Sequence, residues 1–353
     1  MRAAGKSVSA SENQVSVSFD DKVAFLCAPE NYRERARFVT LLQTHHAWVF
    51  MTKRHVFKMK KPFRHGGFDF SSLESRHKLC TEEYRLNRRL AKNTYLGVVP
   101  LVINAKGKLE LDAEGYVVEW LVKMVRLPES RMLLLAASQG RLVRADIQSL
   151  TQKLLRFYQR APICHFGRDG YSAHVRQKLA AWRQELLRPE FAMPAALVNE
   201  VTEQQGAYIE GFAGLLDQRQ QDSNVRELHG DLRPEHIFFV ENGEPEFIDC
   251  LEFDAELRCL DCVEELAFLG MECRHAGLEW IEQECIDCYR INSGQPVVPA
   301  HLWNFYASLG ATTRAGLSAW RTLDSPSVAT WSHRAVDYLH DARHYITSSG
   351  VPH

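Results

Sequence analysis

The chain has 353 residues, 45% of them hydrophobic and 25% charged, so it can bury a large core and divide into two domains. Its formal net charge of -1 gives no general indication of nucleic-acid binding. No apolar run approaches the roughly 18 residues of a membrane-spanning helix, and the N-terminus lacks the apolar segment of a secretory signal. The composition therefore argues against a membrane-spanning or nucleic-acid-binding protein.

The first 21 residues, "MRAAGKSVSASENQVSVSFDD", have low hydrophobicity, and we expect residues 1–21 to form a flexible tail. The tripeptide "GKS" in this segment is not interpreted as a phosphate-binding loop, because no strand and no upstream glycine precede it.

Two short strands are predicted in "AWVFMTKRHVFKMKKPF", residues 47–63, on either side of the polar turn Thr52-Lys53-Arg54. Side chains alternate along a strand, so Lys58 and Lys60 point to the same side of the second one. A lysine in a hydrophobic strand is costly unless its ammonium group is paired or reaches solvent. Residues 51–92 hold 12 Lys/Arg and 4 Asp/Glu, an excess that suits polyphosphate. The alternative is an edge strand with solvated lysines.

A helix is predicted next, over "FDFSSLESRHKLCTEEYRLNRRL", starting with the capping-box pattern Ser71-x-x-Glu74. Its buried stripe is expected at Leu79, Leu86 and Leu90. Glu83 lies close to that stripe, where a carboxylate needs a cation. A strand lysine paired with a glutamate of the following helix positions the ATP phosphates in kinases. A solvated Glu83 is the alternative.

The segment "EGYVVEWLVKM", residues 114–124, predicts a further strand. Helical patterns dominate afterwards, and "ADIQSLTQKLLRFYQRAP" has one apolar face. A strand-rich first third and a helix-rich remainder predict an α+β fold with two lobes. We expect an N-lobe over residues 22–124 and a C-lobe over residues 125–348.

The stretch "HGDLRPEHIFF", residues 229–239, places Asp231 in a loop just before an apolar run. Asn242-Gly243 predicts a hairpin turn, and the returning strand ends at Asp249. The hairpin should therefore bring the carboxylates of Asp231 and Asp249 close together, and a divalent cation would relieve their repulsion. One carboxylate could then accept the proton of an acceptor hydroxyl while the other holds Mg²⁺ against phosphates.

The chain resembles the aminoglycoside phosphotransferase and choline kinase superfamily, which has a protein-kinase-like fold. It looks most similar to a bacterial aminoglycoside-phosphotransferase-like branch. The matching pieces touch most of residues 40–275. They are "HHAWVFMTKRHVFKMKKP", "EEYRLNRRLAKNTYLGVVPL", "VKMVRLP", "HGDLRPEHI", "FIDCLEF" and "RCLDCVEELAFL". "HGDLRPEHI" followed by "FIDCLEF" is the specific part of this resemblance.

The resemblance implies a role for each matching residue. Asp231 resembles the catalytic base, and Asp249 resembles the metal-binding aspartate. Lys58 resembles the phosphate-binding lysine, with Lys60 as the second choice, and Glu83 resembles its helix partner. Two further residues look like structural supports of the catalytic loop: His229 and Asp261.

His236 departs from the family pattern, which usually has an asparagine five residues after the catalytic aspartate. Imidazole is a poorer ligand than an amide oxygen for hard Mg²⁺. Several interpretations stay open: a direct or water-mediated metal ligand, a site that favours Mn²⁺, a group bonded to Asp231 or Asp249, or weak catalysis. Gly66-Gly67 follows Lys58 in sequence and cannot be the glycine-rich loop of protein kinases. We expect "QTHHAW" to cover the phosphates instead.

The nine cysteines, without an export signal, favour free thiols in a reducing cytoplasm. Cys259-x-x-Cys262 and Cys285-x-x-Cys288 have zinc-site spacing. We nevertheless expect core thiols, because Cys262, Cys285 and Cys288 fall on apolar helical stripes.

These observations predict an ATP- and Mg²⁺-dependent phosphotransferase that acts on a hydroxyl of a small molecule. The resemblance implies an amino sugar, an aminoglycoside, a choline-like amine or a sugar. Residues 227–265 hold 13 Asp/Glu and 2 Lys/Arg, and this acidic excess favours a cationic acceptor. Two alternatives are a catalytically silent nucleotide-binding protein, because of His236, and a zinc-stabilised interaction module.

Overall fold

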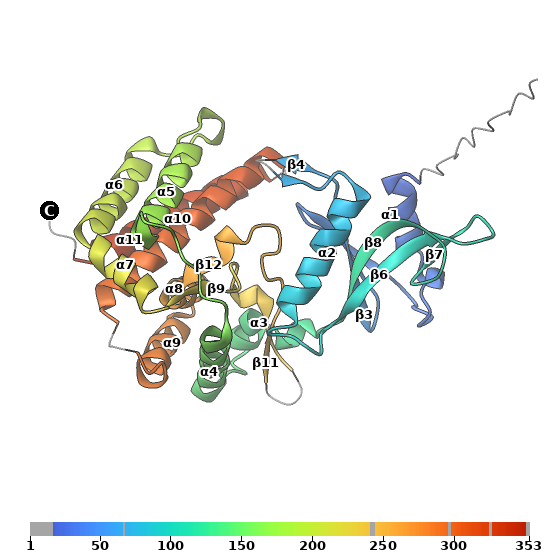
Figure 1. The fold of residues 1–353 in the computed structure, drawn as a ribbon, viewed down its shortest axis with the longest axis horizontal. Coiled ribbons are helices and arrows are strands. Elements are labelled where there is room, and N and C mark those ends of the chain that lie inside the picture. Colours follow the sequence, from blue (N-terminus) through green and yellow to red (C-terminus); the bar gives the residue numbers. More distant parts are fainter. Residues whose placement is uncertain (1–16, 66–67, 241–243, 296–297, 325–326, 351–353) are drawn as a thin grey trace, which may run out of the picture. The chain divides into compact units, whose positions relative to one another are not determined.

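The computed structural model describes residues 17–65, 68–240, 244–295, 298–324 and 327–350. It is an α+β protein that divides into two compact units (Figure 1). Unit 1 comprises Met1–Tyr84 and Tyr95–Arg126, and unit 2 comprises Arg85–Thr94 and Leu127–His353. Each unit has its own hydrophobic core.

Unit 1 is built on an antiparallel sheet of six strands in the order β1-β2-β3-β8-β6-β7. The strands are β1 (Thr40–Gln43), β2 (Ala47–Met51), β3 (His55–Lys60), β6 (Tyr95–Ile103), β7 (Leu109–Leu111) and β8 (Tyr116–Val125). A small separate pair joins β4 (Arg64–His65) to β5 (Phe68–Asp69). The predicted strands on either side of Thr52-Lys53-Arg54 and over residues 114–124 are confirmed as β2, β3 and β8.

Helix α1 (Phe19–Cys27) packs on one face of this sheet, because Leu26 shares a core cluster with Phe50, Phe57 and Met59. The Ser18 hydroxyl caps the helix by accepting the Asp21 amide at 3.1 Å. The helix begins inside the range predicted as a tail, while residues 1–16, with the "GKS" tripeptide, lie outside the described residues.

Helix α2 (Leu73–Asn87) carries two of the three leucines expected on its buried stripe, Leu79 and Leu86, which are at most 6% exposed. Leu90 is also buried but lies beyond the end of the helix. The predicted start of this helix is wrong by one residue. Ser72, not Ser71, accepts the amide of the residue three positions later, Ser75, at 3.0 Å. Ser71 instead bonds Asp69, because the chain turns there out of β5.

Unit 2 is mainly helical. Its helices are α3 (Leu133–Ser138), α4 (Arg144–Arg160), α5 (Gly170–Leu186), α6 (Ala195–Gly211), α7 (Ala213–Gln221), α8 (Cys262–His275), α9 (Glu279–Asn292), α10 (Ala300–Asp324) and α11 (Val328–Thr347). Two short antiparallel pairs carry the candidate site, β10 (Ile237–Phe239) with β11 (Pro245–Phe247), and β9 (Val225–Glu227) with β12 (Cys259–Asp261).

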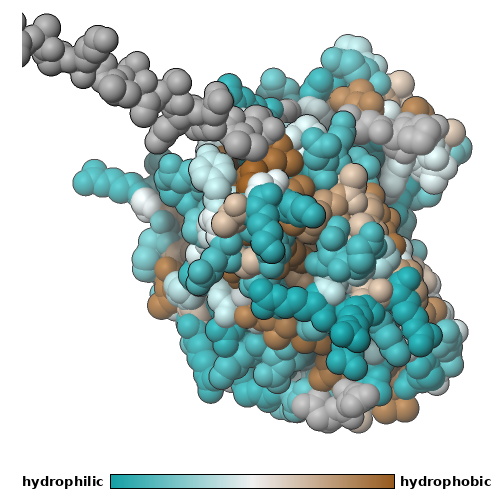
Figure 2. Space-filling view, turned by 90° about the vertical axis from the view of Figure 1, so that its right-hand side faces the viewer, coloured by the Kyte–Doolittle hydropathy of each residue, from teal (hydrophilic) through white to brown (hydrophobic). Residues whose placement is uncertain are grey.

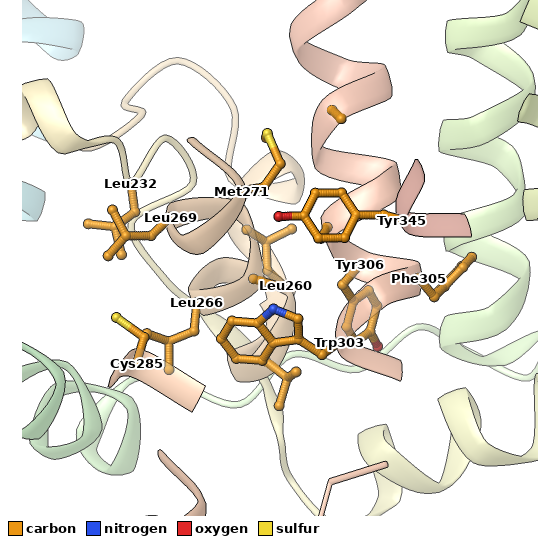
Figure 3. Close-up of a cluster of buried hydrophobic side chains, with 14 of the residues drawn as sticks. Leu232, Leu260, Leu266, Leu269, Met271, Cys285, Trp303, Phe305, Tyr306 and Tyr345 are labelled. Atoms are coloured by element: carbon orange, nitrogen blue, oxygen red, sulfur yellow. The ribbon is translucent and has the colours of Figure 1, made fainter. Parts of the chain in front are cut away.

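The core of unit 2 is formed where α8, α10 and α11 meet. Figure 3 shows Leu266 of α8 close to Trp303 of α10, with Tyr306 of α10 and Tyr345 of α11 beyond it, while Leu269 lies on another side of α8. All five are at most 5% exposed. The apolar face predicted for α4 is also buried, at Ile147, Leu150, Leu154, Phe157 and Tyr158. These helices fix the elements that carry the candidate site.

The cysteines differ from expectation in one respect. Cys262, Cys285 and Cys288 are buried in the core, as predicted. Cys164 and Cys259 are joined by a disulfide, so the expectation of free thiols is wrong for this pair. The pairing follows from the fold, because the chain at Ile163 bridges to Arg226 of β9, and β9 pairs with β12, where Cys259 lies.

Among the described residues, no helix combines the length and the apolar character needed to cross a membrane. Figure 2 shows one face of the molecule, on which hydrophilic side chains predominate and apolar ones are exposed in smaller patches.

Candidate functional site

Unit 1 carries a buried cluster of opposite charges. Lys58 Nζ lies 3.1 Å from a carboxylate oxygen of Glu83, and Lys60 forms an ion pair with the other oxygen. The side chains of Glu83, Lys60 and Lys58 are 0%, 1% and 12% exposed. Both lysines lie on the face of β3 opposite the core residues Phe57 and Met59. Both lysines lie close to Glu83, as the sequence predicts for Lys58, and Lys58 is the more accessible of the two.

The segment "QTHHAW" forms the tight connection between β1 and β2. The amide of Thr44 donates to the Ala47 carbonyl at 2.9 Å. Lys61 binds this connection, because its Nζ donates to the Thr44 carbonyl at 2.6 Å. Its role as a phosphate cover stays a prediction, and Gly66-Gly67 lies outside the described residues.

In unit 2, His229 anchors the loop that carries Asp231. Its Nε2 donates to the Ile248 carbonyl at 3.0 Å, and its Nδ1 accepts the Asp231 amide at 3.4 Å. The ring is completely buried, and burial together with nearby His236 lowers the pKa of His229 to about 3. A neutral ring fits both hydrogen bonds, so His229 ties the loop to the chain segment that leads to Asp249.

The backbone of this loop turns sharply at Gly230, where φ is +82°. A Cβ atom there would approach the Arg258 side chain to 3.0 Å and the Leu251 side chain to 3.2 Å. The amides of His229 and Gly230 both donate to Glu265 of α8, at 2.7 and 2.9 Å. Burial raises the pKa of Glu265 to about 7, although the two amide bonds oppose that rise.

Asp231 points its half-buried carboxylate toward cations. Arg233 Nε lies 3.1 Å from it. Burial alone would raise the pKa of Asp231, but Arg233, His236 and Arg314 outweigh it and lower the pKa below the usual value. The carboxylate is therefore ionised at neutral pH, as a proton acceptor must be.

His236 lies between the two acidic residues and is 7% exposed. Its Nδ1 donates to the Asp231 carbonyl at 2.9 Å, and its Nε2 accepts from Arg233 Nη2 at 2.8 Å. The same ring lies 3.8 Å from the Asp231 carboxylate and 3.6 Å from the Asp249 carboxylate. Both ring nitrogens already have protein partners in this arrangement.

Asp249 follows the predicted hairpin, in which Ile237 pairs with Phe247. The turn Asn242-Gly243 itself lies outside the described residues. Asp249 has a left-handed backbone with φ of +63°, a conformation that aspartate tolerates better than most residues. Its side chain is 42% exposed. The structure thus brings together Asp231, His236 and Asp249, as the hairpin argument predicts.

Asp261 is completely buried. Arg219 holds both of its carboxylate oxygens, at 2.6 and 2.7 Å, and the Tyr306 hydroxyl donates to it at 3.1 Å. Asp261 also caps α8 by accepting the Val263 amide at 2.9 Å. These contacts fit the supporting role that the resemblance implies.

The sequence reasoning missed three residues of this site: Arg233, Glu265 and Arg314. Arg233 could have been found, because it lies inside the quoted motif and a cation beside a catalytic acid lowers its pKa. Glu265 and Arg314 are distant in sequence, and only the packing of α8 and α10 brings them to the loop.

Metal binding can be judged from the donor set. Across the described residues, no group of three or more His, Cys, Asp or Glu side chains is arranged to hold a metal ion. Mg²⁺ is commonly bound by one or two carboxylates together with substrate phosphates. The accessible carboxylate of Asp249, near that of Asp231, fits this mode of binding and not a preformed protein cage.

No family model matches the chain. The chain is 29% identical over 284 residues to uncharacterised proteins of Mycobacterium bovis and Mycobacterium tuberculosis. The match covers 79% of this chain and 54% of those proteins, so the chain spans about half the length of the curated relatives it matches.

Solved structures share the fold at low identity. A choline/ethanolamine kinase family protein from Mesorhizobium loti has a TM-score of 0.54 at 14% identity, covering 92% of this chain and 99% of its own. LicA in complex with AMP has a TM-score of 0.54 at 15% identity, covering 95% and 100%. A mutant of aminoglycoside 2′-phosphotransferase-IIIa, bound to GDP, has a TM-score of 0.52 at 11% identity, covering 88% and 92%. The chain therefore shares the fold of these kinases and phosphotransferases, a protein-kinase-like fold.

Proposed function

We propose that this protein transfers the γ-phosphoryl group of ATP to a hydroxyl group of a small molecule. The observation that carries this proposal is the arrangement of Asp231 and Asp249 around His236, with the pKa of Asp231 held low by neighbouring cations. Small-molecule kinases among the structures of the same fold support this class of reaction, and complexes with AMP and GDP support nucleotide binding.

Each unit supplies part of the chemistry. In unit 1, Lys58 would bind the ATP phosphates, and Glu83 would hold that lysine in place. In unit 2, Asp249 would hold Mg²⁺, which neutralises phosphate charge when bound. Lys60, with almost no exposed surface, would mainly neutralise Glu83.

Asp231 would act on the acceptor. Its carboxylate would accept the hydroxyl proton as the acceptor oxygen forms a bond to the γ-phosphorus and the bond to the ADP oxygen breaks. The products are ADP, a phosphorylated acceptor and a proton that passes from Asp231 to solvent. Arg233 keeps Asp231 ionised before the reaction, since it lies 3.1 Å away.

The test is a ³¹P NMR screen of hydroxyl compounds with ATP and Mg²⁺, which detects a new phosphoester signal and the release of ADP. Asp231→Asn should lower kcat on the order of 10²- to 10⁴-fold, because it removes proton acceptance but keeps the shape of the side chain. Its affinity for the nonhydrolysable analogue AMP-PNP should change little. Wild-type turnover by Asp231→Asn would contradict the role assigned to this loop.

A catalytically silent nucleotide-binding protein is the second candidate. The observation that favours it is His236, whose two nitrogens are bonded to Asp231 and Arg233 at the position where the family usually has asparagine. Such a protein would bind AMP-PNP but would hydrolyse ATP no faster than Asp231→Asn, with Mg²⁺ or Mn²⁺. The zinc-stabilised module loses its support, because Cys259 is bonded to Cys164.

A further inference from the structure

Arginine and aromatic side chains of α10 and α11 alternate in a stack. The guanidinium carbon of Arg321 lies 4.9 Å from the Trp331 ring centre, and that of Arg334 lies 5.6 Å from the same centre. Arg334 also lies 5.7 Å from the Tyr338 ring, and Arg314 lies 5.5 Å from it. We call these five residues the arginine ladder. Stacking holds each guanidinium plane in place and leaves its N–H edge available.

The helices explain why the ladder forms. Arg314 and Arg321 are seven residues apart on α10, which is two turns along one helix face. Trp331, Arg334 and Tyr338 follow the same periodicity on α11. The two helices pack along each other (Figure 1), so the two rows of side chains interleave.

The ladder carries an excess of positive charge. Arg314 is paired with Glu272 at 2.9 Å. Within the described part of the chain, no carboxylate lies within ion-pairing distance of Arg321 or Arg334. The Nε of Arg334 is buried without a hydrogen-bond partner among the described atoms, although its Nη2 donates to the Tyr338 hydroxyl at 3.3 Å. A buried guanidinium N–H without an acceptor is costly and suits an anionic ligand.

The ladder lies near the candidate catalytic base. Arg314 is one of the cations that lower the pKa of Asp231. Burial lowers the pKa of Arg321, as do the charges of Arg233, Arg314 and Arg334, while Asp231 acts in the opposite direction. Arg233, Arg314 and Arg321 therefore interact with Asp231, and Arg334 adds a fourth guanidinium beside Trp331. The carboxylates of Asp231 and Glu272 balance only two of these four charges.

The acids of residues 227–265 were expected from the sequence to favour a cationic acceptor, and some of them are already engaged. Three of the thirteen acids in residues 227–265 are engaged by basic residues of unit 2. Glu227 is paired with Arg258 at 2.6 Å, Asp261 with Arg219 at 2.6 Å, and Glu264 with Lys178 at 3.0 Å. These three carboxylates serve ion pairs of unit 2 and are not available to a cationic acceptor.

From this geometry we infer that the acceptor is an anionic hydroxyl compound, whose carboxylate or phosphate group is bound by Arg321 and Arg334 while its hydroxyl faces Asp231. This inference rests on the proposed function and narrows its substrate class. It is an alternative to the cationic acceptor expected from the sequence. Arg321 and Arg334 are substrate-binding residues in this proposal and take no part in the transfer of the proton.

Anion binding tests the inference without knowledge of the acceptor. Inorganic phosphate and, separately, malonate are titrated into the full chain at constant ionic strength while tryptophan fluorescence is recorded. Saturable binding is expected, and Trp331→Phe should remove most of the signal because Trp331 lies in the ladder. Preference for phosphate or for malonate tells which anionic group the site accepts. Absence of saturable binding of both anions would overturn the inference.

Variants locate the bound anion. Arg321→Ala and Arg334→Ala should each weaken binding of the preferred anion roughly ten- to hundredfold, as expected for a lost charge-assisted hydrogen bond. Arg343→Ala is the matched control, because Arg343 is also on α11 but is paired with Glu200 at 3.7 Å. Arg321→Lys should retain part of the affinity. If the Ala variants change only the thermal unfolding midpoint, the ladder is structural and the inference fails.

Nucleotide binding separates this inference from the proposed function. Anion binding should persist in Lys58→Ala and in the presence of AMP-PNP. If Arg321→Ala weakens AMP-PNP binding as much as anion binding, the ladder serves the nucleotide and the inference fails.

Acceptors from the NMR screen add a second readout, in matched sets of sugar acid, sugar phosphate, free sugar and amino sugar. Transfer to amino or neutral acceptors with kcat/KM unchanged by Arg321→Ala would leave the proposed function intact and overturn this inference. Anion binding without phosphoryl transfer to any acceptor would leave the anion site intact and overturn the proposed function.

Discussion

His236 can act in only a few ways, because its two ring nitrogens have different partners. A proton on Nδ1 satisfies the Asp231 carbonyl and leaves the Nε2 lone pair for Arg233. A metal ion could bind Nε2 only if Arg233 moved away, and hard cations prefer oxygen. We therefore predict that His236 positions Asp231 and Arg233 and does not bind the metal directly.

The first prediction follows from this arrangement. His236→Asn should lower kcat modestly, since asparagine cannot bridge the Asp231 carbonyl and Arg233 in the same way. The ratio of rates with Mg²⁺ and Mn²⁺ should stay unchanged, as measured by ADP release in each metal. A shift of preference toward Mg²⁺ in His236→Asn would mean that the imidazole is a direct ligand in the parent protein.

Lys58 and Lys60 share one carboxylate but differ in access to solvent. Lys58→Ala should weaken AMP-PNP binding roughly tenfold or more, because a charged phosphate contact is lost. Lys60→Ala should instead lower the free energy of unfolding by about 3 kcal/mol, since it leaves buried Glu83 with one cation fewer. Calorimetry with AMP-PNP and urea unfolding separate the two effects.

Lys78→Ala is the control for both lysines, because Lys78 lies on the exposed side of α2 and is paired with Glu74. If Lys60→Ala abolishes nucleotide binding and Lys58→Ala has no effect, Lys60 is the phosphate ligand and the assignment is reversed.

At the scale of elements, helix α8 holds the loop that carries Asp231 through Glu265. The folded protein raises the pKa of this carboxyl to about 7, from an ordinary value of 4.5. Stability from the protonated form is complete below pH 4.5 and is lost as pH rises through about 7, because the unfolded chain ionises first. The loss is about 3 kcal/mol for such a shift.

Glu265→Gln should abolish this part of the pH dependence, since an amide can still accept the two loop N–H groups but does not titrate. Urea unfolding of both proteins from pH 5 to pH 8 should give a difference in stability that moves in favour of the glutamine variant as pH rises. Buried His229, with a pKa of about 3, destabilises both proteins equally below pH 6.5 and cancels in the difference. Parallel pH curves would show that Glu265 stays ionised in the fold.

Helices and strands could be predicted from the sequence where the pattern of neighbouring residues determines them. The alternation in β3, the apolar face of α4 and the hairpin before Asp249 follow from neighbouring residues alone. The start of α2 could not, because two adjacent serines fit the same capping pattern and the turn out of β5 selects Ser72.

At the scale of the whole molecule, the sequence could not predict contacts between residues that are far apart in the chain. The motif residues Asp231, His236 and Asp249 come from one stretch of chain and were predictable together. The arginine ladder and the bond from Glu265 depend on how helices pack, and a single sequence carries no direct record of those contacts. The ion pairs of Glu264 with Lys178 and of Asp261 with Arg219 could not be predicted for the same reason, since these partners lie elsewhere in the chain.

The disulfide joins distant parts of unit 2, because Cys164 and Cys259 are 95 residues apart. Closing a loop of that size removes much of the entropy of the unfolded chain, an effect of up to about 5 kcal/mol. Cys164→Ser, or dithiothreitol, should therefore lower the unfolding midpoint. Cys27→Ser is the control, since Cys27 is a free thiol in unit 1.

Thiol titration of protein unfolded without reductant should find the seven free cysteines, Cys27, Cys80, Cys250, Cys262, Cys273, Cys285 and Cys288. Titration of all nine cysteines, with a midpoint unaffected by reductant, would show that Cys164 and Cys259 remain thiols in the folded protein.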